Sequence, residues 1–380
     1  GAGEGAASQA GVGGEVDDDA AGDLAPEGTG AAGDVVDRGR ARQVLVHGDG
    51  GELGNRLDLP SPPEVGEAPP PGDRLFTRLP SSFTGVRFEN RLEDTQDLNV
   101  YTYRNYYNGG GVALGDLTGD GLPELMLTSN AGEDRLYLNL GGFRFRDITE
   151  AAGLAGREGW TTGVTFADVN GDGRLDIYVS RAGRLPPEAR TNELFVHQGL
   201  DGEGRPVFRE MAAEYGVADP GYTTHAAFFD YDHDGRLDLY VVNNSPRPVS
   251  SFSPWWNQRE LRHPEGGDRL YRNEGGRFVD VSEEAGILGP EAAFGLGVAV
   301  GDVDGDGWPD LYVSNDFFER DYLYLNDRDG TFTNRAAEYL KHQAHNGMGS
   351  DVADYNNDGR PDIMVVDMLP PDNERQKMMI

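Results

Sequence analysis

The segment DVDGDGWPD at residues 302–310 decides the fold, because its pattern occurs five times in this chain of 380 residues. The shared pattern is D-x-[DNT]-x-D-G-x-x-[DE], and each copy lies between a small, apolar segment and a short apolar run. Recurrence at intervals of roughly 50 residues is the signature of a repeat architecture. The other copies are DLTGDGLPE (116–124), DVNGDGRLD (168–176), DYDHDGRLD (230–238) and DYNNDGRPD (354–362).

Two further markers follow each of the first four copies, namely L-[YF]-x-[NH] and a Phe. The distance from the Phe to the next copy stays between 22 and 24 residues, whereas the distance from a copy to the next L-[YF]-x-[NH] varies from 20 to 40. Constant spacing indicates packed structure and variable spacing indicates loops. Each repeat is therefore predicted to hold four short strands, so that the fold is an all-β propeller of four-stranded blades. The markers begin at Leu136, Leu194, Leu270 and Leu323, and the Phe residues are Phe145, Phe208, Phe278 and Phe332.

The acidic loops are the candidate metal-binding segments of the sequence. Three or four carboxylates within nine residues repel one another unless a cation neutralises them, and oxygen ligands around a Gly at position 6 are typical of calcium. An EF-hand shares the opening of the pattern but needs a Glu at position 12 and flanking helices. Position 12 is apolar in every copy, for example Val241 and Val313, which excludes an EF-hand. Five copies also argue against acidic turns without metal.

We therefore expect about five structural calcium ions, one in each loop. The side chains at positions 1, 3, 5 and 9 are the expected ligands, and the carbonyl of position 7 completes the shell. These side chains are Asp116, Thr118, Asp120 and Glu124; Asp168, Asn170, Asp172 and Asp176; Asp230, Asp232, Asp234 and Asp238; Asp302, Asp304, Asp306 and Asp310; and Asp354, Asn356, Asp358 and Asp362.

Composition divides the chain into two parts. Residues 1–74 contain fifteen acidic residues against five Arg and almost no aromatics, so we expect a disordered acidic leader rich in Gly and Pro. Residues 75–380 form the predicted propeller, in which the last repeat is incomplete. Since Phe76 and Gly85 resemble the end of a repeat, the segment 75–89 is expected to be an outer strand that completes a blade. The chain also lacks any L-Y-x-N marker after the fifth loop, so we expect a fragment of a longer protein with further blades.

Charge and residue usage exclude several classes of function. A net charge of −33 argues against nucleic acid as a partner, because nucleic acid requires basic patches. The absence of Cys excludes disulfides and zinc–thiolate sites, and no apolar run reaches the length of a transmembrane segment. No catalytic fingerprint of a hydrolase, metalloprotease or nucleotide-binding enzyme is present, so we expect no catalytic residues.

The loops and their flanking strands resemble FG-GAP/VCBS repeats, the blades of integrin-α-type propellers. The segments LYLNLGGFRFRDITEAAG (136–153) and LYRNEGGRFVDVSEEAG (270–286) are similar to the cartilage-acidic-protein group, associated with ASPIC/UnbV sequences and including bacterial surface proteins. This resemblance implies calcium in the loops, an extracellular or cell-surface location, with a periplasmic or outer-membrane association as a variant, and a role in adhesion or ligand binding. The chain departs from the group in having no recognisable ASPIC-type segment.

We therefore interpret the chain as a calcium-stabilised binding, adhesion or scaffolding module with a protein or glycan ligand of unknown identity. A propeller-fold polysaccharide lyase or hydrolase acting at the channel mouth is the alternative, and an inert spacer is a third. The adjacent Trp255 and Trp256 are candidate ligand contacts; the alternative interpretation, which is the simpler one, is that one Trp pins the loop onto the domain. Scattered His residues such as His225 and His342 match no metal or catalytic motif.

Overall fold

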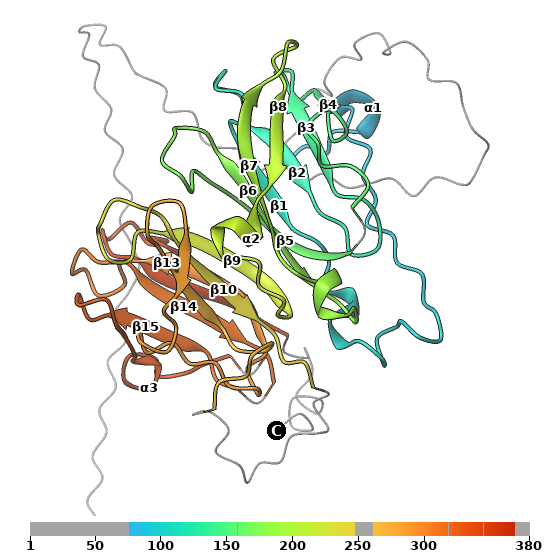
Figure 1. Cartoon of the computed structure of the whole chain (residues 1–380). Coiled ribbons are helices and arrows are strands. Elements are labelled where there is room, and N and C mark those ends of the chain that lie inside the picture. The colour runs from blue at the N-terminus through green and yellow to red at the C-terminus, as the bar shows by residue number, and fades with distance from the viewer. Residues whose placement is uncertain (1–75, 158, 248–260, 318, 345, 369–380) are drawn as a thin grey trace, which may run out of the picture. The chain divides into compact units, whose positions relative to one another are not determined.

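The structure is a computed structural model, which describes residues 76–157, 159–247, 261–317, 319–344 and 346–368. In the described part, four antiparallel sheets of four strands and one sheet of two strands follow one another along the chain (Figure 1). Within each sheet the strands lie in chain order, so that every strand pairs with its neighbour in sequence. Each four-stranded sheet is thus built from one repeat.

The strand bounds follow the repeats closely. The first sheet contains β1 (Val112–Gly115), β2 (Glu124–Leu127), β3 (Arg135–Asn139) and β4 (Phe145–Asp147). The second contains β5 (Trp160–Ala167), β6 (Asp176–Ala182), β7 (Glu193–Leu200) and β8 (Pro206–Glu210). The third contains β9 (Thr223–Phe229), β10 (Asp238–Asn243), β11 (Arg269–Asn273) and β12 (Phe278–Asp280). The fourth contains β13 (Gly295–Gly301), β14 (Asp310–Asn315), β15 (Tyr322–Asn326) and β16 (Phe332–Asn334), and the fifth contains β17 (Gly347–Ala353) and β18 (Asp362–Asp367).

Helical segments are short and lie between strands. They are α1 (Ser81–Thr84), α2 (Ala212–Tyr215), α3 (Ala336–Tyr339) and the 3₁₀ turns η1 (Arg104–Tyr107) and η2 (Pro187–Ala189). None of the described helices is long and apolar enough to cross a membrane. The prediction of an all-β chain with four strands in each of the first four repeats is confirmed. A closed ring is not visible in the described residues.

The core lies between successive sheets and is built from the second strand of each. β6, β10 and β14 are buried along their whole length, so each contributes both faces to the interior. Because side chains alternate along a strand, one face packs against the preceding sheet and the other against the following sheet. The shared clusters join Met126 to Ile177, Tyr178 to Leu239, Tyr240 to Leu311, and Tyr312 to Ile363.

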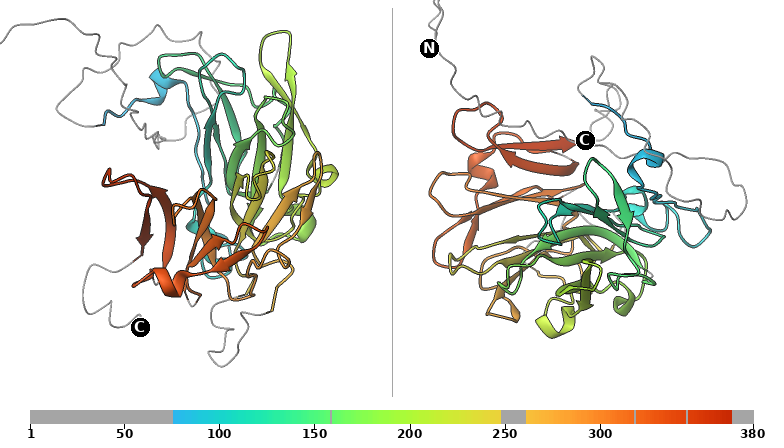
Figure 2. Two further views of the ribbon diagram at one scale, coloured as in Figure 1. Left: turned by 90° about the vertical axis from the view of Figure 1, so that its left-hand side faces the viewer. Right: turned by 90° about the horizontal axis from the view of Figure 1, so that it is seen from above.

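The first strands of neighbouring sheets run parallel and in register. Threonine hydroxyls in the first strand of one sheet donate to backbone carbonyls in the first strand of the following sheet. Two such bonds from β5 join residues that are 61 positions apart in each case, as expected for parallel strands. Because the first strands run parallel, the acidic loops that follow them lie at the same end of the sheets, which we call the loop edge. The segments before the first strands and after the second strands lie at the other end, the opposite edge; Figure 2 shows the sheets from two further sides. The hydroxyl-to-carbonyl bonds are Thr162 to Thr223 at 2.6 Å, Thr165 to Ala226 at 2.9 Å and Thr224 to Gly295 at 2.8 Å.

The segment before the first repeat differs from its prediction. The described residues 76–89 form no strand, and Pro80, which has no backbone N–H, precedes the short helix α1. Gly85 nevertheless ends that helix with φ +79°, as Gly216 does after α2, and a Cβ on either glycine would lie within 3 Å of the carbonyl oxygen of a Phe in a fourth strand. The predicted repeat-end turn is therefore present, but the predicted strand is not. The proposed leader, residues 1–74, lies outside the described residues.

Candidate metal centres in the acidic loops

Each loop is wound around its first carboxylate. In the second loop, Asp168 accepts hydrogen bonds from the backbone N–H groups of Gly171, Asp172 and Gly173 at 2.8, 3.1 and 2.8 Å. The Gly at position 6 makes this possible, since Gly173 has φ +82°, a conformation that side chains with a Cβ rarely adopt. The spacing of the motif therefore folds each loop into a compact turn with its carboxylates gathered on one side.

The carboxylate at position 9 begins the second strand and is buried. Asp238 is fully buried and accepts the N–H of Tyr231 at 3.2 Å with one oxygen and the N–H of Asn273 at 2.7 Å with the other. Burial raises the pKa of Asp238 to about 7, the two N–H groups oppose this, and the nearby Asp232 and Asp234 carboxylates add to it. A cation that displaces the proton would relieve both burial and repulsion.

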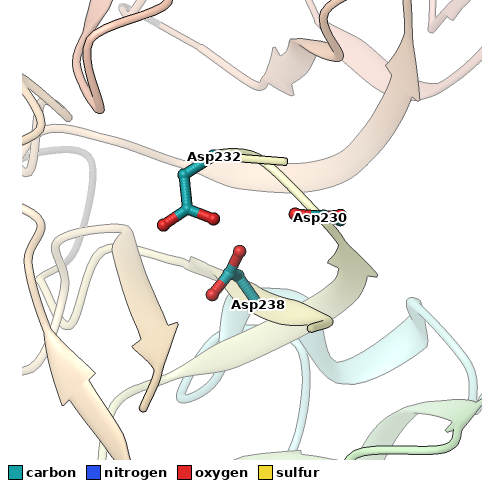
Figure 3. Close-up of side chains that lie close together, drawn as sticks. All are labelled: Asp230, Asp232 and Asp238. Atoms are coloured by element: carbon teal, nitrogen blue, oxygen red, sulfur yellow. The ribbon is translucent and has the colours of Figure 1, made fainter. Parts of the chain in front are cut away.

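Two loops bring three carboxylates together. One oxygen from each of Asp230, Asp232 and Asp238 lies within 4.8 Å of the others (Figure 3), and Asp302, Asp304 and Asp310 are arranged in the same way. Positions 1, 3 and 9 thus meet as the spacing predicts. A set of carboxylate oxygens with no nitrogen or sulfur suits a hard cation such as calcium. These residues therefore fit the metal that the sequence implies.

Position 5 is arranged differently. Its carboxylate lies outside both three-carboxylate groups and is turned toward an arginine. Asp306 accepts from Nε and Nη2 of Arg328 at 2.7 and 2.6 Å, and Asp172 pairs with Arg174 at 2.6 Å. A cation therefore has to displace a guanidinium group before the carboxylate at position 5 can bind it. The first, second and fifth loops hold a neutral side chain at position 3, and no group of three acids gathers in them within the described residues.

A side chain of the next repeat fastens each of three loops. The last residue of the L-[YF]-x-[NH] marker donates a hydrogen bond to the carbonyl at position 2 of the preceding loop, in the pairs His197–Leu117 at 3.0 Å, Asn273–Val169 at 2.9 Å and Asn326–Tyr231 at 2.8 Å. In His197 the other ring nitrogen accepts from the N–H of Gly199, so Nε2 carries the proton and donates. The sequence marks these residues by their recurrence, but their role as ties between repeats is visible only in the structure.

A second set of carboxylates, missed by the sequence analysis, lies at the opposite edge. Asp268 and Asp321 each stand two residues before the Leu of a marker, and each is buried. Asp268 accepts the backbone N–H of Asn243 at 2.9 Å and the hydroxyl of Tyr240 at 3.0 Å. Burial raises the pKa of Asp268 to about 7, against the effect of both hydrogen bonds. Each of these two carboxylates is bonded to groups of its own repeat, and neither belongs to a group of three potential metal ligands in the described part of the chain.

The remaining sequence candidates are not part of these clusters. Trp255 and Trp256 lie outside the described residues. His225 is partly buried in β9, where burial lowers its pKa, and His342 is exposed on a loop. Neither joins a group of potential metal ligands within the described part of the chain.

Comparison with known proteins supports the assignment of the repeats. The FG-GAP-like repeat matches residues 116–179, 261–313 and 302–365. Cartilage acidic protein 1 of Xenopus tropicalis is 28% identical over 214 residues, which cover 56% of this chain and 29% of that protein. The human protein of the same name is 28% identical over 215 residues, covering 55% of this chain and 28% of that protein. The matched region therefore spans less than a third of these relatives.

Solved structures give weaker similarities. A lectin of Agrocybe aegerita that recognises non-reducing terminal N-acetylglucosamine aligns with a TM-score of 0.37 and 18% identity over 67% of this chain and 59% of its own. The V. cholerae biofilm matrix protein Bap1 aligns with a TM-score of 0.33 and 15% identity over 67% of this chain and 34% of its own. The sequence matches are thus the informative ones: the chain contains FG-GAP-like repeats and is a distant homologue of cartilage acidic protein 1.

Proposed function

We propose that this chain is an extracellular, calcium-stabilised β-propeller module that binds a ligand rather than transforming one. The observation that carries the proposal is the meeting of Asp230, Asp232 and Asp238 in one loop, repeated by Asp302, Asp304 and Asp310 in the next. The pattern is common to all five loops, and we propose one ion in each. Calcium would neutralise the gathered carboxylates and hold together the two strands that flank each loop.

Calcium in the loops would also stabilise the packing between repeats. The loop at 230–238 is tied to the next repeat by Asn326, and His233 of this loop stacks on Trp308 of the following loop with ring centroids 4.1 Å apart. An ion that orders one loop therefore also orders the contact between this repeat and the next. Since calcium binds the folded loops and has little affinity for the unfolded chain, mass action converts its binding into stability of about 2.7 kcal/mol per site at a hundredfold excess over Kd.

Exposed apolar residues on the first and last sheets of the series support the proposal of a propeller. Val112 and Leu114 are more than 60% exposed on β1, and Met364 and Val366 are about half exposed on β18. The corresponding faces of the sheets between them are covered by a neighbouring sheet. Apolar strand faces of this kind are stable in water only when another sheet packs on them, and a ring of blades provides such a cover.

A binding role is supported by the way the carboxylates are used. The acids that cluster are held by backbone N–H groups within their loops, and the buried acids of the opposite edge are hydrogen-bonded to backbone and Tyr hydroxyl groups. A general acid or base needs a free carboxyl group within reach of a substrate. We therefore propose no catalytic residue, and incubation with neutral and acidic polysaccharides should release neither reducing ends nor unsaturated products.

Thermal unfolding with and without calcium tests the proposal. The melting temperature of the full chain should fall strongly when a chelator is added and return when calcium is restored. Magnesium at the same concentration should restore less, because Mg²⁺ gives up its water ligands reluctantly. A melting temperature that is the same in calcium and in chelator would refute the proposal.

A further inference from the structure

A cavity of about 710 Å³ lies at the opposite edge, away from the acidic loops. Its volume is within the range of about 300–1,000 Å³ found for small-molecule sites. The walls come from the segment 100–105, from the loop after β6 and from the residues that follow β10. The side chains that matter for its chemistry are Tyr101, Tyr103, Arg104, Arg184, Tyr222 and Arg247.

The charge of this cavity is opposite to that of the chain. Three arginines line it, and the described lining contains no carboxylate, although the chain carries a net charge of −33. Arg184 is exposed and forms no ion pair with any described residue. Arg104 lies 4.3 Å from the ring centroid of Phe317 and is attracted by the carboxylate of Asp316, while Arg247 is paired with Glu291 just outside the lining. The cavity therefore offers at least one guanidinium group whose charge is not compensated.

An aromatic side chain is presented to solvent beside these arginines. Tyr101 is 97% exposed, yet its backbone belongs to a tightly bonded turn. The side chain of Asn99 accepts the N–H groups of Tyr101 and Thr102 at 2.9 and 3.2 Å, and Thr102 Oγ1 accepts the N–H of Asn99 at 2.9 Å. The ordered turn fixes the place at which this ring is presented, so a ligand that covers the ring has to order the side chain but not the backbone.

The floor of the cavity is rigid. Tyr103 packs edge-on against the buried Trp160 at 5.3 Å, and its hydroxyl accepts the N–H of Gly183 at 3.2 Å. Tyr222 lies beneath the guanidinium of Arg190 at 4.1 Å, and that arginine is itself buried and bonded to backbone carbonyls. Aromatic rings fixed in this way give a preformed surface on which a flat ligand face can stack.

These features together select a ligand class. A guanidinium group binds a carboxylate through two parallel hydrogen bonds, and tyrosine rings stack on the apolar faces of sugars. The strongly negative chain repels ligands of high charge density, which favours a ligand with few carboxylates over a heavily sulfated polymer. We propose that this cavity binds a uronic-acid-containing oligosaccharide, with a carboxylate on Arg184 and a sugar ring on Tyr101. This inference rests on the proposed function and names the ligand of the binding module.

Titration calorimetry of the full chain in calcium tests the assignment. The probes are tetrasaccharides that contain glucuronate, galacturonate or mannuronate, each compared with the same sugar after reduction of its carboxylates to alcohols. At least one acidic probe should bind, and its reduced form should bind at least tenfold more weakly. Arg184→Ala and Tyr101→Ala should each weaken binding at least tenfold without changing the melting temperature, whereas Arg184→Lys should retain part of it.

Two variants serve as matched controls. Arg174→Ala removes an exposed arginine from the loop edge, and Tyr339→Ala removes a half-exposed tyrosine outside the cavity, so both should bind the probe as the unmodified chain does. Failure of every acidic probe to bind, or binding unchanged in Arg184→Ala, would overturn the inference. Equal binding of a hexaglutamate peptide would overturn the carbohydrate assignment. If the chain is stabilised by calcium but binds no probe, only this inference fails and the proposed function stands.

Discussion

The loop edge and the opposite edge of the sheets are built from the ends of the same strands, yet they handle buried negative charge in different ways. At the loop edge, Asp230, Asp232 and Asp238 are gathered so closely that they repel one another. At the opposite edge, Asp268 belongs to no such group of three and is bonded to a backbone N–H and a tyrosine hydroxyl, with Arg262 attracting it and Asp219 repelling it. Three carboxylates can gather where a cation from solution compensates them, whereas a buried carboxylate without a cation depends on hydrogen bonds from the chain itself.

The largest effect is expected from Asp238→Asn in calcium. This substitution keeps the shape of the side chain but removes a charged ligand, so the free energy of unfolding in calcium should fall by about 3 kcal/mol, the contribution of one well-filled site. In chelator the contribution of the ion is absent and the loss should be smaller. A loss of about 1–2 kcal/mol should remain in both conditions, because the amide places an NH2 group against one of the two N–H donors that Asp238 accepts.

Chemical denaturation in calcium and in chelator measures both values. Asp329→Asn, which changes an exposed acid outside the loops, is the control and should cost little in either condition. An equal loss in calcium and in chelator would mean that Asp238 is a purely structural acceptor, and the contrast between the two edges would disappear.

The next effect concerns pH at the opposite edge. Burial raises the folded-state pKa of Asp268 to about 7, above the value of about 4 for an exposed Asp. The folded chain therefore keeps a proton that the unfolded chain releases, so this group makes the free energy of unfolding fall as pH rises from about 4 to about 7. The slope from one such group approaches 1.4 kcal/mol per pH unit at most, a rough upper bound.

Asp268→Asn should remove this part of the slope, since the amide does not titrate. Denaturation of the two proteins between pH 4 and 8, both in chelator, isolates the difference. Parallel pH profiles would show that Asp268 does not hold its proton in the folded state.

A smaller effect is expected at the tie between repeats. Asn326→Ala removes the hydrogen bond to the carbonyl of Tyr231 and leaves that buried oxygen without its donor, which should cost about 1–2 kcal/mol more than Asn139→Ala. Asn139 is the equivalent residue of the first repeat, and within the described residues its side chain donates only to position 8 of its own loop, the carbonyl of Pro123 at 2.8 Å; Asn326 makes the equivalent bond to Pro309 at 3.3 Å in addition to its bond to Tyr231. Equal losses in the two variants would mean that the bond between repeats contributes nothing.

The smallest effect on stability is expected from Arg328→Ala. This exposed arginine pairs with Asp306, and exposed ion pairs contribute less than about 1 kcal/mol. Unfolding in chelator should therefore be nearly unchanged, while calcium affinity of the fourth loop should rise because Asp306 becomes free to turn toward the ion. Calcium titration followed by Trp308 fluorescence measures that affinity, and a weaker affinity in the variant would show that the arginine supports the site.

The repeat, its strands and its loops could be predicted from patterns along the chain. The Gly at position 6 and the acids around it specify one turn, and residues such as Ile177 and Tyr178 specify a strand buried on both faces, because these choices depend only on neighbours along the chain. One local prediction was wrong. The segment 75–89 was predicted to be an outer strand because of its Phe and Gly, but its described residues form no strand, and Pro80 lacks the N–H group that a strand would use.

The groups that meet across repeats could not be predicted in this way and are visible only in the folded chain. Nothing near Asn326 in sequence indicates that it reaches Tyr231, ninety-five residues earlier. Arg184 and Tyr101 were equally unremarkable as single residues, and they line one cavity because the second strands end where the segment 100–105 passes. Motif spacing specifies contacts within a repeat, where the chain is short and stiff. Contacts between repeats depend on how whole sheets pack, and that is set by the sum of many buried side chains.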